Sequence, residues 1–197
     1  MKLVLASKNA HKLVEMKDIL SQLGVEVVLE SEAGVDVDVE ETGATFEENA
    51  YLKAHAVMEA SGLPAIADDS GLCVDALNGA PGVYSARYGG EGLDDAGRYR
   101  LLLENMRGQT PRTAKFVSVI TCCFPNGDVL TARGECPGTI AFAPMGEGGF
   151  GYDPVFFIPS LKKTFAQLSP EEKNAISHRG KALEAFQVKL EEYLKKN

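Results

Sequence analysis

The sequence has no apolar stretch that approaches the roughly 20 residues of a membrane-spanning helix. The apolar run at residues 2–6 is too short for a signal peptide, and polar residues follow it at once. Repeats, low-complexity tracts and linkers are absent as well. With 45% hydrophobic and 24% charged residues, the composition is that of an ordinary globular protein. We expect a soluble, cytoplasmic protein with no membrane partner, folded as a single domain over residues 1–197.

An excess of basic residues is also lacking, since the formal net charge is −8. DNA and RNA are bound by broad basic surfaces, so this balance argues against a nucleic-acid partner. A small anion such as a nucleotide needs only a few local cations and a metal ion. A nucleotide ligand is therefore compatible with the charge, provided that lysines gather at one place.

Cysteine is scarce and shows no regular spacing. The four cysteines form no C-x-x-C pair, and the three histidines do not complete a zinc ligand set. Cys122 and Cys123 are neighbours on an expected strand, so their side chains should point to opposite faces. We interpret all four cysteines as reduced, small apolar residues.

Hydrophobic periodicity predicts a mixture of strands and helices. Strands are expected at 2–6, 25–29, 65–67, 113–124 and 128–142, and helices at 9–23, from 45 to 61, and at 94–107. The second of these helices should open with a capping box, in which Thr45 is the N-cap and the Glu48 side chain bonds the N-cap backbone. Residues 35–39 alternate between valine and aspartate, as in a half-exposed strand or an extended loop. Strands and helices do not alternate strictly, and the last two strands form a long hairpin. We therefore expect an α/β fold with a mixed central β-sheet flanked by helices.

The first group of candidate site residues lies where the first strand meets the first helix: Ser7, Lys8, Asn9, Ala10, His11 and Lys12. Free backbone N–H groups and the positive end of the helix dipole suit a phosphate there. Asn9 and Lys12 are three residues apart, so both can face one ligand. Plain helix capping by Ser7 or Asn9, with Lys12 in solvent, explains the same residues.

The second group consists of carboxylates, Glu40, Glu41, Asp68 and Asp69, with Lys53 between them in the sequence. Carboxylates at strand ends are the oxygen ligands that Mg²⁺ prefers, completed by waters and substrate phosphates. If the strand continues through Asp68 and Asp69, their side chains point to opposite sides of the sheet. One should then bind metal or act as general base, and the other should support it. A simple turn after the strand is the alternative.

The glycine-rich stretch 146–151 matches G-x-G-x-x-G literally. A dinucleotide site is excluded because no helix can follow, since Asp153-Pro154 and an apolar run come next. A loop that presents Phe150 or Tyr152 to a base fits better. Packing of Phe150 into the core is the alternative.

The last group is Lys173 with Ser177-His178-Arg179. On one unbroken helix the three basic side chains could not face the same ligand. If they act together, the helix must break near Ser177, which can cap a new helix that starts at His178. A capping box at Ser169 opens this helical region. A solvated basic stripe is the alternative interpretation.

Taken together, these motifs resemble a known family. They are Ser7-x-Asn9-x-x-Lys12, Glu41-Thr42-Gly43-x-Thr45-Phe46-x-Glu48-Asn49-Ala50, Ala67-Asp68-Asp69-Ser70-Gly71-Leu72, Gly79-Ala80-Pro81-Gly82-Val83-Tyr84-Ser85-Ala86-Arg87-Tyr88, Gly148-Gly149-Phe150-Gly151-Tyr152-Asp153-Pro154 and Ser177-His178-Arg179-Gly180-Lys181-Ala182. This set is similar to the inosine triphosphate pyrophosphatase family, the dITP/XTP pyrophosphatases. The resemblance covers essentially the whole chain, with the motifs in the expected order.

The resemblance implies an elongated α/β fold with two lobes, an active-site cleft between them, and a homodimer. It implies a Mg²⁺-dependent hydrolase that cleaves the non-standard purine nucleotides ITP, dITP and XTP to the monophosphate and pyrophosphate. Such an enzyme removes these nucleotides from the pool before they enter DNA or RNA.

The resemblance also implies a role for each candidate residue. Asp69 would bind Mg²⁺ and act as general base, and Glu41 would help to hold the metal. The substrate would contact Ser7, Lys8, Asn9, Ala10, His11, Lys12, Lys53, Ser70, Phe150, Gly151, Tyr152, Asp153, Lys173, His178 and Arg179. Lys8 departs from the family, which often has a small or neutral residue there, and should add positive charge near the phosphates.

Three other classes of protein fit these residues less well. A Maf-like pyrophosphatase shares the strand followed by Ala6-Ser7, but typically continues with Ser-Pro-Arg-Arg, where this chain has Lys8-Asn9-Ala10-His11. A nucleotide sensor without catalysis would keep the base pocket and lose Asp69 or Glu41, and both are present. A structural or interaction protein would have no reason to cluster its glycines and lysines.

Overall fold

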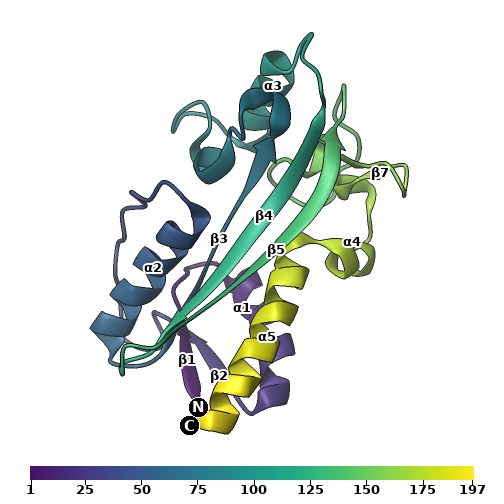
Figure 1. Cartoon of the computed structure of the whole chain (residues 1–197). Coiled ribbons are helices and arrows are strands. Elements are labelled where there is room, and N and C mark those ends of the chain that lie inside the picture. The colour runs from purple at the N-terminus through teal and green to yellow at the C-terminus, as the bar shows by residue number, and fades with distance from the viewer. The chain divides into compact units, whose positions relative to one another are not determined.

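The structure is a computed structural model of residues 1–197, and it describes all of them except the side chain of His11. The strands are β1 (Lys2–Leu5), β2 (Glu26–Leu29), β3 (Ala65–Val74), β4 (Thr113–Cys123), β5 (Val129–Ile140), β6 (Phe156–Ile158) and β7 (Lys163–Thr164). The α-helices are α1 (Ala10–Leu20), α2 (Phe46–Ser61), α3 (Asp95–Asn105), α4 (Pro170–Ile176) and α5 (His178–Lys196). The strands form one sheet in the order β2-β1-β3-β4-β5-β6-β7 (Figure 1).

The sheet is mixed, as the sequence predicts. Strand β1 pairs in parallel with both β2 and β3, whereas β6 pairs antiparallel with both β5 and β7. By its internal contacts the chain divides into two compact units. Unit 1 comprises residues 1–69, 118–134 and 181–197, and unit 2 comprises residues 70–117 and 135–180.

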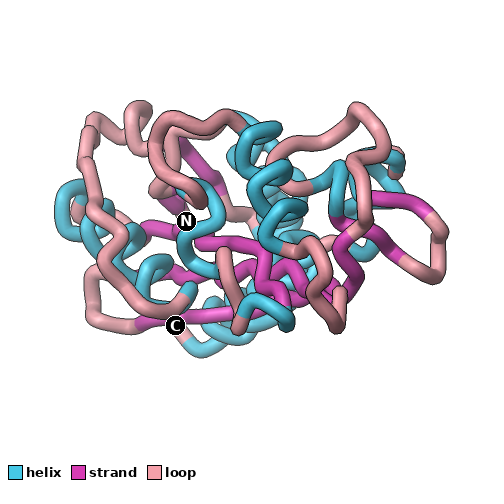
Figure 2. The backbone as a smooth tube through the Cα atoms, turned by 90° about the horizontal axis from the view of Figure 1, so that it is seen from above, coloured by secondary structure: helices cyan, strands magenta, loops and turns pink.

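Unit 1 has helices on both faces of its strands (Figures 1 and 2). Leu3 and Leu5 of β1 pack with the apolar faces of α1 and α5, whereas Val4 packs with α2. Strand β3 follows the same pleat, with Ile66 on the α1 side and its two neighbouring alanines on the α2 side. A strand buried on both faces explains why residues 2–6 and 65–67 read as continuous apolar runs.

Unit 2 has its own hydrophobic core. Leu72 and Val74 from β3, Leu102 from α3, and Phe116 from β4 pack there with Phe156 of β6. The ring of Phe116 lies edge-on to that of Phe156, with centroids 4.5 Å apart. Each unit can therefore hold its functional side chains on a packed framework of its own.

Most of the expected elements are present, with two instructive differences. Strand β3 runs to Val74, whereas the apolar run predicts an end at 67, because the polar residues Asp68, Asp69 and Ser70 continue in extended conformation. Thr45 caps α2 as predicted by accepting a hydrogen bond from Glu48 N, but the Glu48 carboxylate bonds Ala44 N, one residue before the cap. Residues 35–39 form an extended loop.

None of the four cysteines forms a disulfide bond, which agrees with the expectation that they are reduced. Cys122 packs with Ile120 in one core cluster, and Cys123 packs with Val4 in another, so the two side chains do point to opposite faces. None of the helices that the structure describes is long and apolar enough to cross a membrane.

Candidate active site

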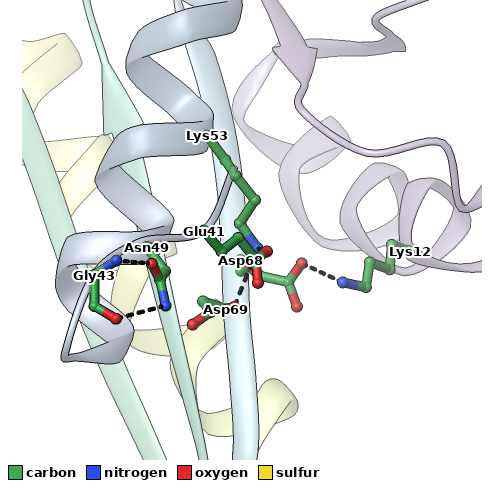
Figure 3. Close-up of polar contacts among 7 residues, drawn as sticks. All are labelled: Lys12, Glu41, Gly43, Asn49, Lys53, Asp68 and Asp69. Carbon is green, nitrogen blue, oxygen red and sulfur yellow. Dashed lines mark hydrogen bonds and ion pairs between the residues drawn. The ribbon is translucent and has the colours of Figure 1, made fainter. Parts of the chain in front are cut away.

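Two adjacent aspartates of β3 face opposite sides of the sheet of unit 1. Asp68 lies on the α1 side, where its Oδ1 accepts a hydrogen bond of 2.7 Å from Lys12 Nζ. Asp69 lies on the α2 side, where its Oδ1 accepts one of 3.2 Å from Lys53 Nζ (Figure 3). Strand β3 continues through both residues, which is the condition under which the sequence places the two side chains on opposite sides of the sheet, and the alternative of a turn is wrong.

Lys53 is the centre of this group. Its ammonium contacts Asp69 Oδ1 at 3.2 Å, Glu41 Oε1 at 3.0 Å and the backbone oxygen of Asp68 at 2.7 Å. Three acceptors match the three N–H donors of a lysine ammonium. We call Lys12, Glu41, Lys53, Asp68 and Asp69 the carboxylate–lysine cluster.

The electrostatics of the cluster centre on Asp69. Burial raises the pKa of Asp69 to about 6; Lys53 opposes this rise, and the neighbouring charge of Glu41 adds to it. Burial lowers the pKa of Lys53, but Asp69, Asp68 and Glu41 together bring the pKa above its ordinary value. Lys53 is therefore a fixed cation, and Asp69 is a carboxyl group that can exchange a proton near neutral pH.

A magnesium ion fits the oxygens of this cluster. Asp69 Oδ2 is buried and has no hydrogen-bond partner within the described part of the chain, so one lone-pair donor remains for another ligand. The described side chains include no group of three or more metal-binding residues. Mg²⁺ needs no such group, because it commonly binds one or two carboxylates together with waters and substrate phosphates. Glu41 and Asp69, both bonded to Lys53, can supply those carboxylates.

The loop that carries Glu41 is fastened to helix α2. Gly43 N donates a hydrogen bond of 2.8 Å to Oδ1 of Asn49, and Asn49 Nδ2 lies 3.5 Å from Gly43 O (Figure 3). Sequence reasoning quoted Asn49 in a motif and gave it no role. Its spacing of one helical turn from Lys53 is the signal that could have revealed it.

The expected phosphate-binding residues lie at the start of α1. Ser7 Oγ accepts a hydrogen bond of 3.0 Å from Asn9 N, and the helix begins at Ala10. Lys8 is exposed and forms an ion pair with Asp36 at 3.2 Å. The prediction for His11 concerns a side chain outside the described residues.

Phe150, Asp153 and Lys173 come together in unit 2. Lys173 Nζ donates a hydrogen bond of 2.6 Å to Asp153 Oδ2 and lies 4.7 Å from the centre of the Phe150 ring. Phe150 N also donates to Asp153 Oδ2, at 3.2 Å. Burial raises the pKa of Asp153, while the charges of Lys173 and Arg179 oppose that rise.

The two aromatic residues of the glycine-rich loop have different surroundings. The Phe150 side chain is 61% exposed, whereas Tyr152 is buried and its hydroxyl donates to Ser85 O at 2.6 Å. Gly149 adopts φ +70°, and a Cβ there would lie 2.1 Å from Asp153 Oδ2, so the loop requires glycine. Gly151 N donates to Asp95 Oδ2 at 3.0 Å. Phe150 is thus the ring available to stack on a ligand.

The predicted helix break before His178 is confirmed. Helix α4 ends at Ile176, Ser177 has extended backbone, and α5 begins at His178. Ser177 Oγ accepts a hydrogen bond of 3.1 Å from Gly180 N and so caps α5. The His178 ring stacks on Phe116 with centroids 4.8 Å apart, a contact that sequence reasoning missed. We call Phe150, Asp153, Lys173, His178 and Arg179 the aromatic–basic cluster.

Ser70 follows Asp69 on β3 and is partly buried. The glycine-rich loop leads into a short 3-10 turn at Asp153–Val155 and then into β6, so no α-helix follows it, as predicted.

The structure is thus that of an α/β protein with a mixed sheet, a partly buried carboxylate–lysine cluster in unit 1 and an aromatic–basic cluster in unit 2. The chain belongs to the Ham1 family, whose model matches residues 3–189.

Curated relatives and a solved structure agree with this assignment. The chain is 47% identical over 195 residues to a dITP/XTP pyrophosphatase of Exiguobacterium sp., covering 99% of this chain and 100% of the relative. It is 53% identical over 193 residues to a dITP/XTP pyrophosphatase of Haemophilus influenzae, covering 96% of this chain and 98% of the relative. The structure of the Staphylococcus aureus Ham1 protein matches with a TM-score of 0.92 and 47% identity, covering 98% of this chain and 100% of that one.

Proposed function

We propose that this chain is a Mg²⁺-dependent pyrophosphatase that hydrolyses dITP, ITP and XTP to the nucleoside monophosphate and pyrophosphate. The pyrophosphatase activity on dITP and XTP follows from family membership and from full-length relatives of that name. The single structural observation that carries the site is the arrangement of Asp69, which has one oxygen bonded to Lys53 and the other buried without a partner among the described residues.

The carboxylate–lysine cluster can perform the chemistry of phosphoanhydride hydrolysis. Asp69, with a pKa of about 6, takes the proton of the attacking water as general base. Lys12 and Lys53 stabilise the negative charge that develops on the departing pyrophosphate. Glu41 and Asp69 would hold Mg²⁺, which when bound would neutralise phosphate charge and orient the triphosphate.

Residues 7–10 and His11 supply the remaining triphosphate contacts in this proposal. Asn9 and Ala10 stand at the beginning of α1, where the positive end of the helix dipole favours an anion. A phosphate there would compete with Asp36 for the exposed Lys8 ammonium. Ser70, next to Asp69, completes the set of contacts.

The aromatic–basic cluster would bind the base of the same substrate. The exposed ring of Phe150 offers a stacking surface, and the loop through Gly151, Tyr152 and Asp153 fixes its position. Lys173, His178 and Arg179 supply donors for the edge of the base. Hypoxanthine and xanthine have a carbonyl at the six-position that accepts from such donors, whereas the amino group of adenine would leave a buried donor unpaired.

We further propose that the two units work together as a single catalytic domain, in the cytoplasm, as a homodimer. The nucleotide pool that such an enzyme clears is dissolved in that compartment. The support for the dimer is the resemblance to the family, and sedimentation at micromolar concentrations tests it directly.

A pyrophosphate-release assay with ITP, XTP, dITP, GTP and ATP, with and without Mg²⁺, tests the proposed reaction. We expect release from the first three and little from ATP, in each case only with the metal. Equal rates with GTP would refute the proposed specificity. Orthophosphate as the first product would refute the reaction itself.

A further inference from the structure

Asn49 is a fully buried polar residue, 0% exposed, on the first turns of α2. Its side chain has its hydrogen bonds with the backbone of Gly43, in the loop before the helix. A buried amide is costly unless it is hydrogen-bonded, so this contact must favour one position of the loop. That loop carries Glu41, two residues before Gly43.

The fit between Asn49 and the loop is close on both sides. Gly43 N donates to Asn49 Oδ1 at 2.8 Å, which is a short and well-formed bond. A Cβ at Gly43 would lie 2.7 Å from the same Oδ1 and 2.7 Å from Glu48 Cβ. Only glycine lets the backbone approach the helix this closely.

Other bonds from the same helix end hold the neighbouring residues. The Glu48 carboxylate accepts from Ala44 N at 2.6 Å, and Thr45 Oγ1 accepts from Glu48 N at 3.1 Å. The loop therefore follows α2 as a rigid extension over residues 43–45.

Asn49 and Lys53 are one turn apart and share a face of α2. Asn49 fixes the backbone of the loop, while Lys53 bonds the Glu41 carboxylate at 3.0 Å and Asp69 at 3.2 Å (Figure 3). One face of α2 thus contacts both the backbone of Gly43 and the side chain of Glu41, two residues earlier in the same loop.

We infer that Asn49 is a positioning residue, which through Gly43 holds the Glu41 carboxylate where it can share a divalent cation with Asp69. The inference rests on the proposed function for the identity of the metal site. Asn49 does not touch the substrate or the metal in this scheme. Its role is to make the pair of carboxylates preorganised, so that the cation need not order the loop on binding.

The test compares Asn49→Ala and Gly43→Ala with the control Glu47→Gln. Asn49→Ala removes the acceptor for Gly43 N. Gly43→Ala keeps Asn49 but places a Cβ where it forces the loop away from α2. Glu47 lies in the first turn of the same helix but pairs with Arg133, away from the loop, so its change probes the helix end alone. The rate of dITP hydrolysis is measured against Mg²⁺ concentration, and binding of Mn²⁺ alone is measured by electron paramagnetic resonance.

We expect Asn49→Ala and Gly43→Ala each to raise the half-saturating Mg²⁺ concentration about tenfold or more, as is typical when a supporting contact of a metal ligand is lost. The kcat at saturating Mg²⁺ should stay within about threefold of the wild type, because the metal and its ligands are still present. Mn²⁺ binding should weaken in parallel, and Glu47→Gln should match the wild type in both measurements.

A purely structural role of Asn49 would lower thermal stability and leave the Mg²⁺ dependence unchanged, and that result overturns the inference. A loss of kcat that saturating Mg²⁺ does not restore overturns it as well. If Asn49→Ala does not fold, Gly43→Ala decides. The Mn²⁺ titration needs no substrate, so weaker binding by the variants supports the positioning role even if the wild type fails to hydrolyse dITP, which would refute the proposed function instead.

Discussion

Asp68 and Asp69 are identical in chemistry and adjacent in the chain, yet the pleat of β3 gives each a different partner. Asp68 is almost fully buried against Lys12 of α1, whereas Asp69 meets Lys53 of α2 and keeps one oxygen without a partner among the described residues. Asp68 is thus neutralised by a lysine, and Asp69 retains an oxygen for another ligand. The geometry favours Asp69 for the reaction and Asp68 for the placement of Lys12.

Removing the charge of Asp69 should stop the reaction without abolishing substrate binding. General-base catalysis alone contributes about 100-fold to 10,000-fold, so Asp69→Asn should lower kcat at least about 100-fold. Nucleotide affinity, measured by calorimetry, should change far less, since the lysines and the aromatic–basic cluster remain. Near-normal turnover of Asp69→Asn would contradict the assignment of this residue.

The same substitution should stabilise the metal-free protein at neutral pH. The folded-state pKa of Asp69 is about 6 against an ordinary value of 3.8, so the folded chain binds the proton more tightly than the unfolded chain. The contribution of Asp69 to the stability of the wild type therefore falls as the pH rises from about 4 to 6, and stays lower above that window. Asp69→Asn lacks this loss, so urea denaturation at pH 7.5 should show the variant to be more stable by up to about 3 kcal/mol. The difference in stability between Asp69→Asn and the wild type should shrink at pH 4.5. If the stabilities of the two proteins instead change in parallel with pH, the pKa of Asp69 is not raised.

At the scale of elements, the break between α4 and α5 decides how the basic residues are presented. Ser177 ends one helix in extended backbone and caps the next, so that Lys173 and His178 belong to different helices. The geometry of an ideal helix predicts this break if Lys173, His178 and Arg179 act together, because an unbroken helix could not aim all three side chains at one ligand. The stacking of His178 on Phe116 could not be predicted, since it joins α5 to a strand distant in the sequence.

The two serine caps of this region provide a matched pair of variants. Ser177 Oγ caps α5 and Ser169 Oγ caps α4, each through a hydrogen bond of 3.1 Å from a backbone N–H. Ser177→Ala and Ser169→Ala should each cost about 1 kcal/mol of stability in chemical denaturation. Only Ser177→Ala should also raise the KM for dITP, because the first residues of α5 are His178 and Arg179. Equal effects of both variants on the KM would show that the position of the α5 start is unimportant for binding.

At the scale of the whole molecule, residue patterns predicted the α/β class, the mixed sheet and nearly all helices. The prediction of element boundaries was weakest where polar residues continue a strand, as Asp68 and Asp69 do in β3. Hydrophobic periodicity reveals only apolar buried positions, whereas these two aspartates are held by partners distant in the sequence, Lys12 and Lys53. In the candidate site, the motif residues could be named, but not which lysine faces which aspartate. Asn49 was given no role because its partner is the backbone of Gly43, and in the sequence only its spacing of one helical turn from Lys53 points to it.

Variants in the two clusters should differ in their effects on pyrophosphate, which lacks the base, and on dITP, which carries it. Inorganic pyrophosphate resembles the triphosphate without the base, so Lys53→Ala should weaken product inhibition by pyrophosphate. Phe150→Ala should leave that inhibition unchanged and raise the KM for dITP about tenfold, since base stacking is worth about 1–3 kcal/mol.

Phe142→Ala provides the control for the loss of an exposed phenylalanine, because this side chain is 85% exposed and lies against Arg112. It should leave both the KM and the inhibition constant at wild-type values. Weaker pyrophosphate inhibition of Phe150→Ala would contradict the division of labour between the two clusters.

The neighbouring cysteines of β4 give this chain a built-in pair of reporters. Cys122 and Cys123 lie in different apolar layers, and burial raises the pKa of both thiols, that of Cys123 to about 11. Neither thiol should react with an alkylating reagent until its own layer opens. Trypsin, cleaving after Lys115 and Arg133, releases both on one peptide, so the singly labelled species seen by mass spectrometry during unfolding would identify which layer loosens first.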